Sequence, residues 1–110
     1  MPIAVDSMRA EMAQEYATRC LFASLHTVDP GQTGSDELAG IVRQAITWNV
    51  GDADGEIVSD SITFTLSAPA YVSHIGLWSG LSGGTFRDSL LVAADLPAGD
   101  YIVALSYTQT

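Results

Sequence analysis

The residues best suited to acid–base chemistry in this sequence are its two histidines, His26 and His74, because their charge changes near neutral pH. A hydrolytic site would also need a serine nucleophile within hydrogen-bond distance of the ring and an acid that orients it. Serines are plentiful, but we identify none of them in a Gly-x-Ser-x-Gly nucleophile elbow or another such motif. We therefore predict no catalytic residue and expect both histidines to be half-buried strand residues with hydrogen-bonded ring nitrogens.

A second candidate for chemistry is the acidic segment 52–60, which resembles the start of a calcium loop. Its acids Asp52, Asp54, Glu56 and Asp60 stand at loop positions one, three, five and nine. The two most constrained positions fail, because Ile57 replaces the glycine and Thr63 replaces the bidentate acid. An Asp-Gly hairpin turn explains the segment better. No metal or other cofactor is predicted.

Composition limits the kinds of partner. Thirteen acids stand against four arginines and no lysine, which gives a net charge of −9. Phosphate backbones and anionic membrane surfaces would be repelled, so neither nucleic acid nor membrane is an expected partner. The single cysteine allows no intrachain disulfide and no zinc-binding cysteine cluster. The N-terminal residues lack the basic and apolar regions of a signal peptide, so we expect synthesis in the cytoplasm.

The elements that must position these residues fall into two parts. Residues 1–19 form a predicted helical arm with Met8, Met12 and Tyr16 at intervals of four, and this apolar stripe is the candidate assembly interface. It packs either on its own domain or on a neighbouring subunit. From residue 20 the apolar period changes to two, which predicts six strands at about 20–28, 41–50, 57–66, 71–78, 85–93 and 101–109.

Short strands separated by Gly-, Pro- and Asp-rich turns predict an all-β domain over residues 20–110, an antiparallel sandwich or flattened barrel of about six to eight strands. Loops 29–40 and 51–56 are both candidates for the outward-facing end. The predicted structural core contains Trp48, Phe64, His74, Gly76 and Trp78. Gly76 leaves space either for a ligand or for a large side chain, and the available Trp48, Phe64 and Trp78 favour packing.

Four stretches in order, Leu21–Gly34, Gly40–Trp48, Val72–Trp78 and Gly83–Phe86, carry the motif HT-DPG-TG, then a strand from Gly to Arg-Gln, then V-HIGLW, then GG-F. This pattern resembles a family of small bacteriophage virion proteins usually labelled tail fibre or minor tail proteins. The resemblance implies a structural, non-enzymatic subunit of the virion that binds other tail or capsid proteins and forms a homo-oligomer. A lysine-poor surface suits such permanent contacts.

Two alternatives remain open at this point. One is a capsid decoration protein on the phage head. The other is a carbohydrate-binding module at the tail tip, in which Trp78, Trp48 or Tyr71 would stack on a host surface glycan beside an acid such as Asp88.

Overall fold

The computed structural model describes residues 5–51 and 55–109 of the chain. Within these residues there are one helix and nine strands, which confirms a mainly β fold with an N-terminal helix. Their bounds are α1 (Asp6–Arg19), β1 (Phe22–His26), β2 (Gln44–Ala45), β3 (Trp48–Val50), β4 (Glu56–Ser59), β5 (Ile62–Leu66), β6 (Ala70–Trp78), β7 (Phe86–Leu96), β8 (Gly99–Val103) and β9 (Ser106–Thr108).

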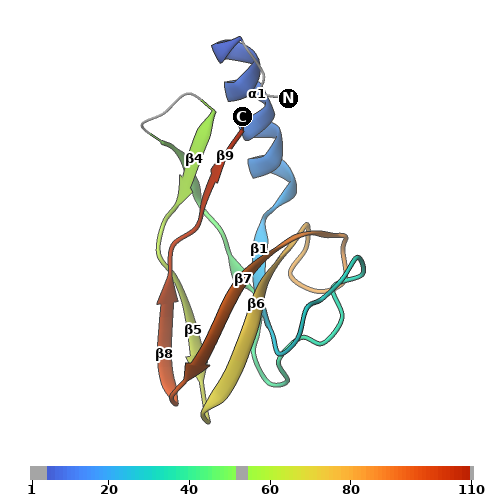
Figure 1. The fold of residues 1–110 in the computed structure, drawn as a ribbon, viewed down its shortest axis with the longest axis vertical. Helices are drawn as coiled ribbons and strands as arrows, with labels where there is room; N and C mark the ends of the chain where they lie inside the picture. Colours follow the sequence, from blue (N-terminus) through green and yellow to red (C-terminus); the bar gives the residue numbers. More distant parts are fainter. Residues whose placement is uncertain (1–4, 52–54, 110) are drawn as a thin grey trace.

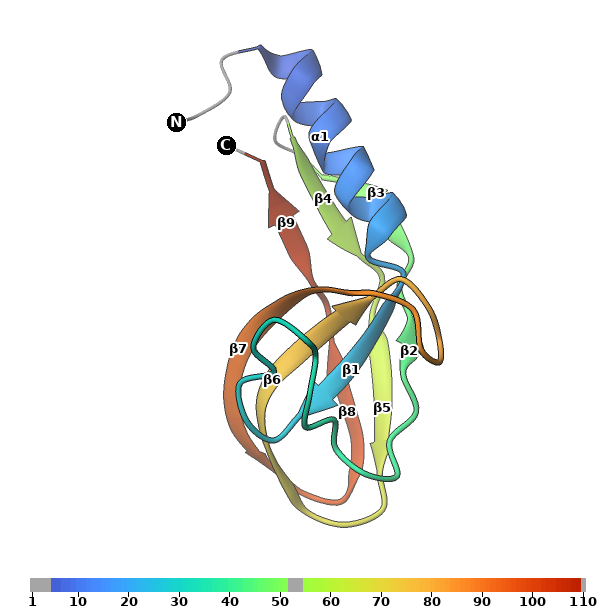
Figure 2. The same ribbon diagram turned by 90° about the vertical axis from the view of Figure 1, so that its right-hand side faces the viewer.

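The body of the molecule is an antiparallel sandwich of two layers rather than a closed barrel (Figures 1 and 2). One layer is a four-stranded sheet in the order β2-β1-β6-β7, and the other is the pair β5-β8. The alternation in β5 points Ile62, Phe64 and Leu66 into the core, while Thr63 and Thr65 are exposed. These three side chains pack against the inward face of the first layer, whose buried residues are Ala23, Leu25, Val72, Ile75 and Leu77.

A smaller sheet, in the order β3-β4-β9, extends the molecule at one end and carries α1 (Figure 1). It continues the β5-β8 pair along the chain, because β4 leads into β5 and β8 leads into β9. Ser59, at the end of β4, and Leu105, just before β9, are joined by two hydrogen bonds. The Ser59 main-chain N–H donates to the Leu105 carbonyl oxygen, and the Leu105 main-chain N–H donates to the Ser59 hydroxyl. The resulting shape is long, with principal extents of 46 × 26 × 23 Å.

The prediction of one continuous strand over 41–50 is wrong. This segment leaves one sheet and joins another: β2 pairs with β1, and β3 pairs with β4. Ile46, between the two short strands, is buried, whereas Val42 and Val50 are exposed. Strands that pass from one sheet to another at a bend are common at the corners of β-sandwiches, and such a bend breaks the simple alternation of faces.

The turn predicted over 94–100 is also shorter than expected, because β7 runs on to Leu96 and β8 begins at Gly99. β7 is irregular in two places. Val72 pairs with Ala94 and His74 with Leu91, so two residues of β7 face one residue of β6. A second shift separates the pairs Leu77–Asp88 and Trp78–Phe86. These are β-bulges, which bend and twist a strand.

Candidate functional site

A chain of buried hydrogen bonds lies on the outer face of the four-stranded sheet. It connects the stretch Leu21–Gly34 to the stretch Val72–Trp78. The Trp78 indole N–H donates to Ser24 Oγ at 2.8 Å, and Ser24 Oγ lies 2.6 Å from His26 Nε2. His26 Nδ1 lies 2.8 Å from the carbonyl oxygen of Ser35. Because a carbonyl only accepts, Nδ1 carries the proton, and Nε2 accepts the hydrogen of the Ser24 hydroxyl.

Gly76 makes this chain possible. A Cβ atom at position 76 would lie 2.4 Å from His26 Nε2 and 2.7 Å from Ser24 Oγ. A Cβ at Gly76 would indeed meet packed side chains. However, these side chains are His26 and Ser24 on the paired strand β1, instead of the predicted Trp48, Phe64 or Trp78. The sequence contained a signal for this, since period-two alternation already placed Ser24 and His26 on one face of a strand.

Trp78 is the centre of the same cluster. The Arg43 guanidinium lies 3.6 Å from the centroid of the Trp78 ring, in cation–π geometry. Phe86 meets the ring edge to face, with centroids 5.1 Å apart. Gly34, which has a positive φ of 75°, lies so close to the indole that a Cβ would be 2.5 Å from it. Each motif of the sequence contributes one of these residues to a single cluster, which we call the Trp78 cluster.

Arg43 also ties two loops together. Its Nη1 donates to the carbonyl oxygens of Gly80 and Gly83 at 3.0 and 2.8 Å, and its Nη2 donates to Glu37 Oε1 at 2.6 Å. The loop 27–43 is thus held over the sheet and against the turn 79–85. Sequence reasoning did not single out Ser24, Gly34, Arg43 or Phe86, because their role depends on which strands are neighbours.

The geometry of the two Ser–His pairs does not provide a reactive serine. Ser24 and His26 are 2% and 0% exposed, and the ring of His26 is oriented by a main-chain carbonyl instead of a carboxylate. His74 is half-buried and its Nδ1 lies 2.8 Å from the hydroxyl of Ser73, its neighbour on the strand. Hydrolysis of this type requires an accessible serine and a carboxylate that is hydrogen-bonded to the histidine and orients its ring.

One motif was missed in the sequence: residues 80–84 read Gly-Leu-Ser-Gly-Gly, which is the spacing of a nucleophile elbow. Such an elbow places its serine between a strand and a helix. Here the segment is a largely exposed turn between the strands β6 and β7. The spacing therefore marks a tight turn, in which Gly83 and Gly84 adopt positive φ.

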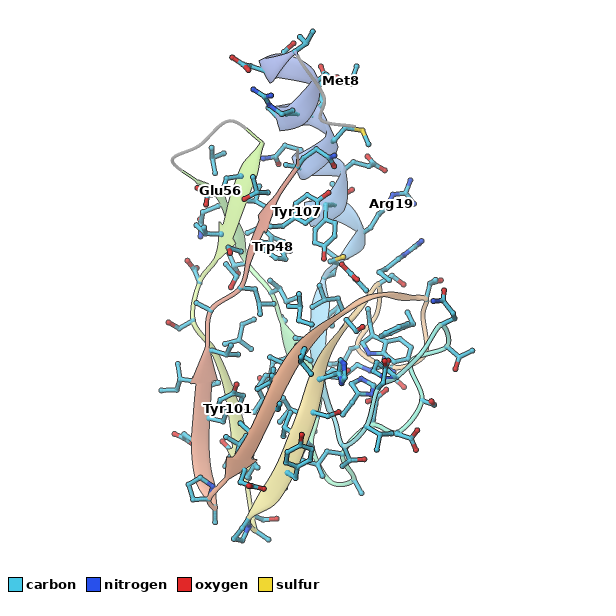
Figure 3. All side chains as sticks on the ribbon, in the orientation of Figure 1. Met8, Arg19, Trp48, Glu56, Tyr101 and Tyr107 are labelled. Atoms are coloured by element: carbon cyan, nitrogen blue, oxygen red, sulfur yellow. The ribbon has the colours of Figure 1, made fainter. Side chains whose placement is uncertain are left out.

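The predicted assembly residues of the arm separate into two groups. Met8 and Met12 are 46% and 43% exposed, and with the exposed Val5 they form an outer apolar stripe on α1. Figure 3 shows Met8 on the side of the helix that points away from β4. Tyr16 instead packs on the domain's own core, which includes Cys20 at the end of the helix, and Ala13 of α1 is buried.

An aromatic cluster fastens α1 to the small sheet. The Tyr16 ring stacks on Tyr107 of β9, with centroids 3.8 Å apart, and meets Trp48 of β3 edge to face at 6.1 Å. Its hydroxyl donates to Asp88 at 2.6 Å, and the Trp48 indole N–H donates to the Cys20 carbonyl at 2.8 Å. Figure 3 shows Trp48 and Tyr107 between the small sheet and the helix.

Burial sets the titration of this cluster. Burial, and next the hydrogen bond to Asp88, raise the pKa of Tyr16 far above its ordinary value. Burial also raises the pKa of the Cys20 thiol from 9.0 to about 11, and it raises the pKa of Tyr107 with help from the charge of Asp88. These groups stay neutral at physiological pH, so the helix packs through uncharged side chains.

The predicted core residues occupy different depths. Phe64 and Gly76 are buried, Trp78 is 7% exposed, and Trp48 and His74 are half-buried. The two tryptophans therefore present little ring surface to a sugar. Tyr71 is more open, at 47% exposed, and its paired residue on β7 is Asp95.

The described residues of the acidic segment, 55–60, do not form a metal site. Asp52 and Asp54 lie outside the described residues, while Glu56 belongs to β4 and Asp60 accepts a hydrogen bond from Asn49. Within residues 5–51 and 55–109, no three His, Cys, Asp or Glu side chains gather in a metal-binding arrangement. A polar hollow of about 190 Å³ does lie between Gly31 and β7, lined by Asp88, but that carboxylate is the one bonded to Tyr16.

Fold and site together define a small β-sandwich module whose sequence motifs hold its loops and whose helix carries an exposed apolar stripe. The described part of the chain contains no helix long and apolar enough to cross a membrane. The family model described as podophage GP4 fiber I protein gp80 matches residues 8–106, and the chain belongs to this family of phage fibre proteins. No curated protein and no solved structure gives a significant match.

Proposed function

We propose that this chain is a non-enzymatic structural subunit of a phage tail fibre, made in the host cytoplasm and incorporated into the virion. The observation that carries the proposal is the Trp78 cluster, in which the motif residues pack against one another and form hydrogen bonds with one another. No buried side-chain nitrogen or oxygen in the described residues lacks a hydrogen-bond partner. Such a site stabilises a scaffold, because its buried polar groups are satisfied by one another.

The arm, residues 1–19, is the proposed attachment element of the sandwich, residues 20–110. Its inner face is fastened by Tyr16, so its outer stripe of Val5, Met8 and Met12 is the part free to contact another virion protein. Methionine is common in such contacts because its flexible side chain adapts to different surfaces. Placement in the tail instead of on the capsid is part of this proposal.

The test replaces Met8 and Met12 by glutamate in the phage and measures the amount of the chain in purified particles. We expect incorporation to fall at least tenfold, while the purified variant keeps the thermal unfolding midpoint of the wild type, because both side chains are exposed. The matched control is the pair Gln14→Glu and Thr18→Glu, which adds the same charge on a different exposed side of the helix. Normal incorporation of the methionine variant would refute the role of the stripe.

A second candidate function is contact with a host glycan, and the exposure of Tyr71 opposite Asp95 is the observation that favours it. An aromatic ring beside an acid can stack on a sugar and accept hydrogen bonds from its hydroxyls. Tyr71→Ala would then reduce adsorption to host cells without reducing incorporation into particles. Unchanged adsorption would dismiss this candidate.

A further inference from the structure

The core of the sandwich is incompletely covered along one side. Five of the ten apolar residues that pack on the core yet remain partly exposed lie on two strands, β7 and β8: Leu90, Val92, Leu96, Tyr101 and Val103. β7 and β8 follow each other in the chain but belong to different layers, and they are not paired with each other. We call this side of the sandwich the open seam.

At the β7 border of the open seam, the edge strand is protected from pairing with another strand. Its two bulges interrupt the regular alternation, and Ala93 in one of them has a positive φ of 53°. Bulges on edge strands are a usual protection against pairing with another chain, because they twist the edge away and break the row of free main-chain groups.

The β8 border has no such protection. Its five residues pair with β5 in unbroken register from Ile62–Val103 to Leu66–Gly99. β8 is an edge strand, and it forms the left-hand outline of the molecule in Figure 1. It contains no proline and no lysine, and its outward residue Ile102 is 61% exposed. A regular apolar edge of this kind is a template for another strand.

We propose that β8 pairs with β8 of a second copy of this chain, antiparallel and centred on Ile102. In that register, Ile102 lies opposite Ile102 of the second copy on the outer face. On the core face, Tyr101 lies opposite Val103 of the second copy, and Val103 opposite its Tyr101. The side chains that are half-buried at the open seam in one copy are therefore covered by the same side chains of the other.

The charges select this arrangement over a parallel one. Asp100 is the charged residue of β8, and its carboxylate accepts a hydrogen bond from Thr65 at 3.0 Å. A parallel, in-register pair would place Asp100 beside Asp100, and like charges directly opposite each other destabilise a sheet. The antiparallel pair places Asp100 opposite the small, uncharged Ala104 instead. A self-complementary patch of this type is what a two-fold dimer requires.

The pairing also extends the architecture without disturbing it. Two β5-β8 pairs would join into one continuous layer of four strands, β5-β8-β8-β5. The Trp78 cluster and the outer stripe of α1 belong to other elements and are not covered by this pairing. The inference depends on the proposed function in one respect, because a fibre subunit must contact other subunits. The β8 edge is the surface that we assign to one such contact.

The test uses disulfide trapping of the full chain. In a Cys20→Ala background, Ile102→Cys should form a disulfide-linked dimer under mild oxidation, because directly opposite residues of an antiparallel pair bring their Cβ atoms to about 4.5–5.5 Å, close to what a disulfide needs. The matched control is Val50→Cys, which is at least as exposed and also lies on an edge strand, β3. It should remain unlinked on the same time scale.

Sedimentation equilibrium provides an independent readout. The wild type should show a dimer of the 11.6 kDa chain, and Ile102→Arg should weaken dimerisation at least tenfold while Val50→Arg leaves it unchanged. A wild type that stays monomeric up to millimolar concentration, or a dimer that survives Ile102→Arg, would overturn the proposal. The structural role in the virion would not fall with it, because that role is tested by incorporation of the Met8 and Met12 variant into particles.

Discussion

Replacing Gly76 by alanine is the most informative single change to the Trp78 cluster. The added Cβ would lie 2.4 Å from His26 Nε2, 2.7 Å from Ser24 Oγ and 3.0 Å from His26 Cδ2. Both neighbours are buried, and both take part in the hydrogen-bond chain from Trp78 to Ser35. The methyl group therefore cannot be accommodated by turning a flexible side chain into solvent.

Two effects add in this variant. Overpacking of a well-filled site costs about 1–3 kcal/mol. Displacing the His26 ring or the Ser24 hydroxyl leaves at least one buried polar group without its partner, which costs about 1–3 kcal/mol more. We expect Gly76→Ala to lose about 2–6 kcal/mol of unfolding free energy, a large part of the about 5–15 kcal/mol typical of one domain.

The assay is a urea titration followed by tryptophan fluorescence, with Gly80→Ala as the matched control. At Gly80 a Cβ would have no heavy atom closer than 3.6 Å, so the control should stay within about 0.5 kcal/mol of the wild type. A double variant with His26→Ala should lose less than the sum of the two single losses, since removing the ring removes the clash. Wild-type stability of Gly76→Ala would refute the described role of the cluster.

Three further outcomes follow from the structure. Ala93→Gly should raise the unfolding free energy by about 0.5–1 kcal/mol, because glycine adopts the positive φ of this bulge without strain; a loss of stability would contradict this. Tyr16→Phe removes the 2.6 Å hydrogen bond to Asp88 and should cost about 1–2 kcal/mol in a urea titration, whereas wild-type stability would mean that stacking alone holds the helix. Because the pKa of Cys20 rises from 9.0 to about 11 on folding, the unfolded chain loses that proton first. Stability should therefore be full below about pH 9 and decline as the pH rises toward about 11, by up to about 2–3 kcal/mol, and Cys20→Ala should remove this part of the decline.

The sequence was sufficient to predict which side chains share a face of a strand, but not which strand lies beside it. Period-two alternation placed Ile62, Phe64 and Leu66 on the inward face of one strand, and the structure has them buried. It also put Gly76 and Trp78 on one face. What fills the space at Gly76 could not be read from alternation, because the answer depends on the pairing of Gly76 with Ser24, 52 positions earlier.

The same limit explains the misplaced strand boundaries. Alternation predicted one strand over 41–50, but Ile46 lies where the chain passes from one sheet to another, and such a passage depends on contacts distant in the sequence. Likewise the apolar stripe of the arm did not reveal which of its members face inward. Tyr16 turns toward Tyr107, which comes near the end of the chain, and Met8 is left outside.

The most direct test of this account is a reconstruction of the phage particle by cryo-electron microscopy. We predict density for the two-layered sandwich in a fibre of the tail, with Val5, Met8 and Met12 covered by a second virion protein and no substrate or metal at the Trp78 cluster. Particles that lack the chain, or that carry it with this stripe fully exposed to solvent, would contradict the account.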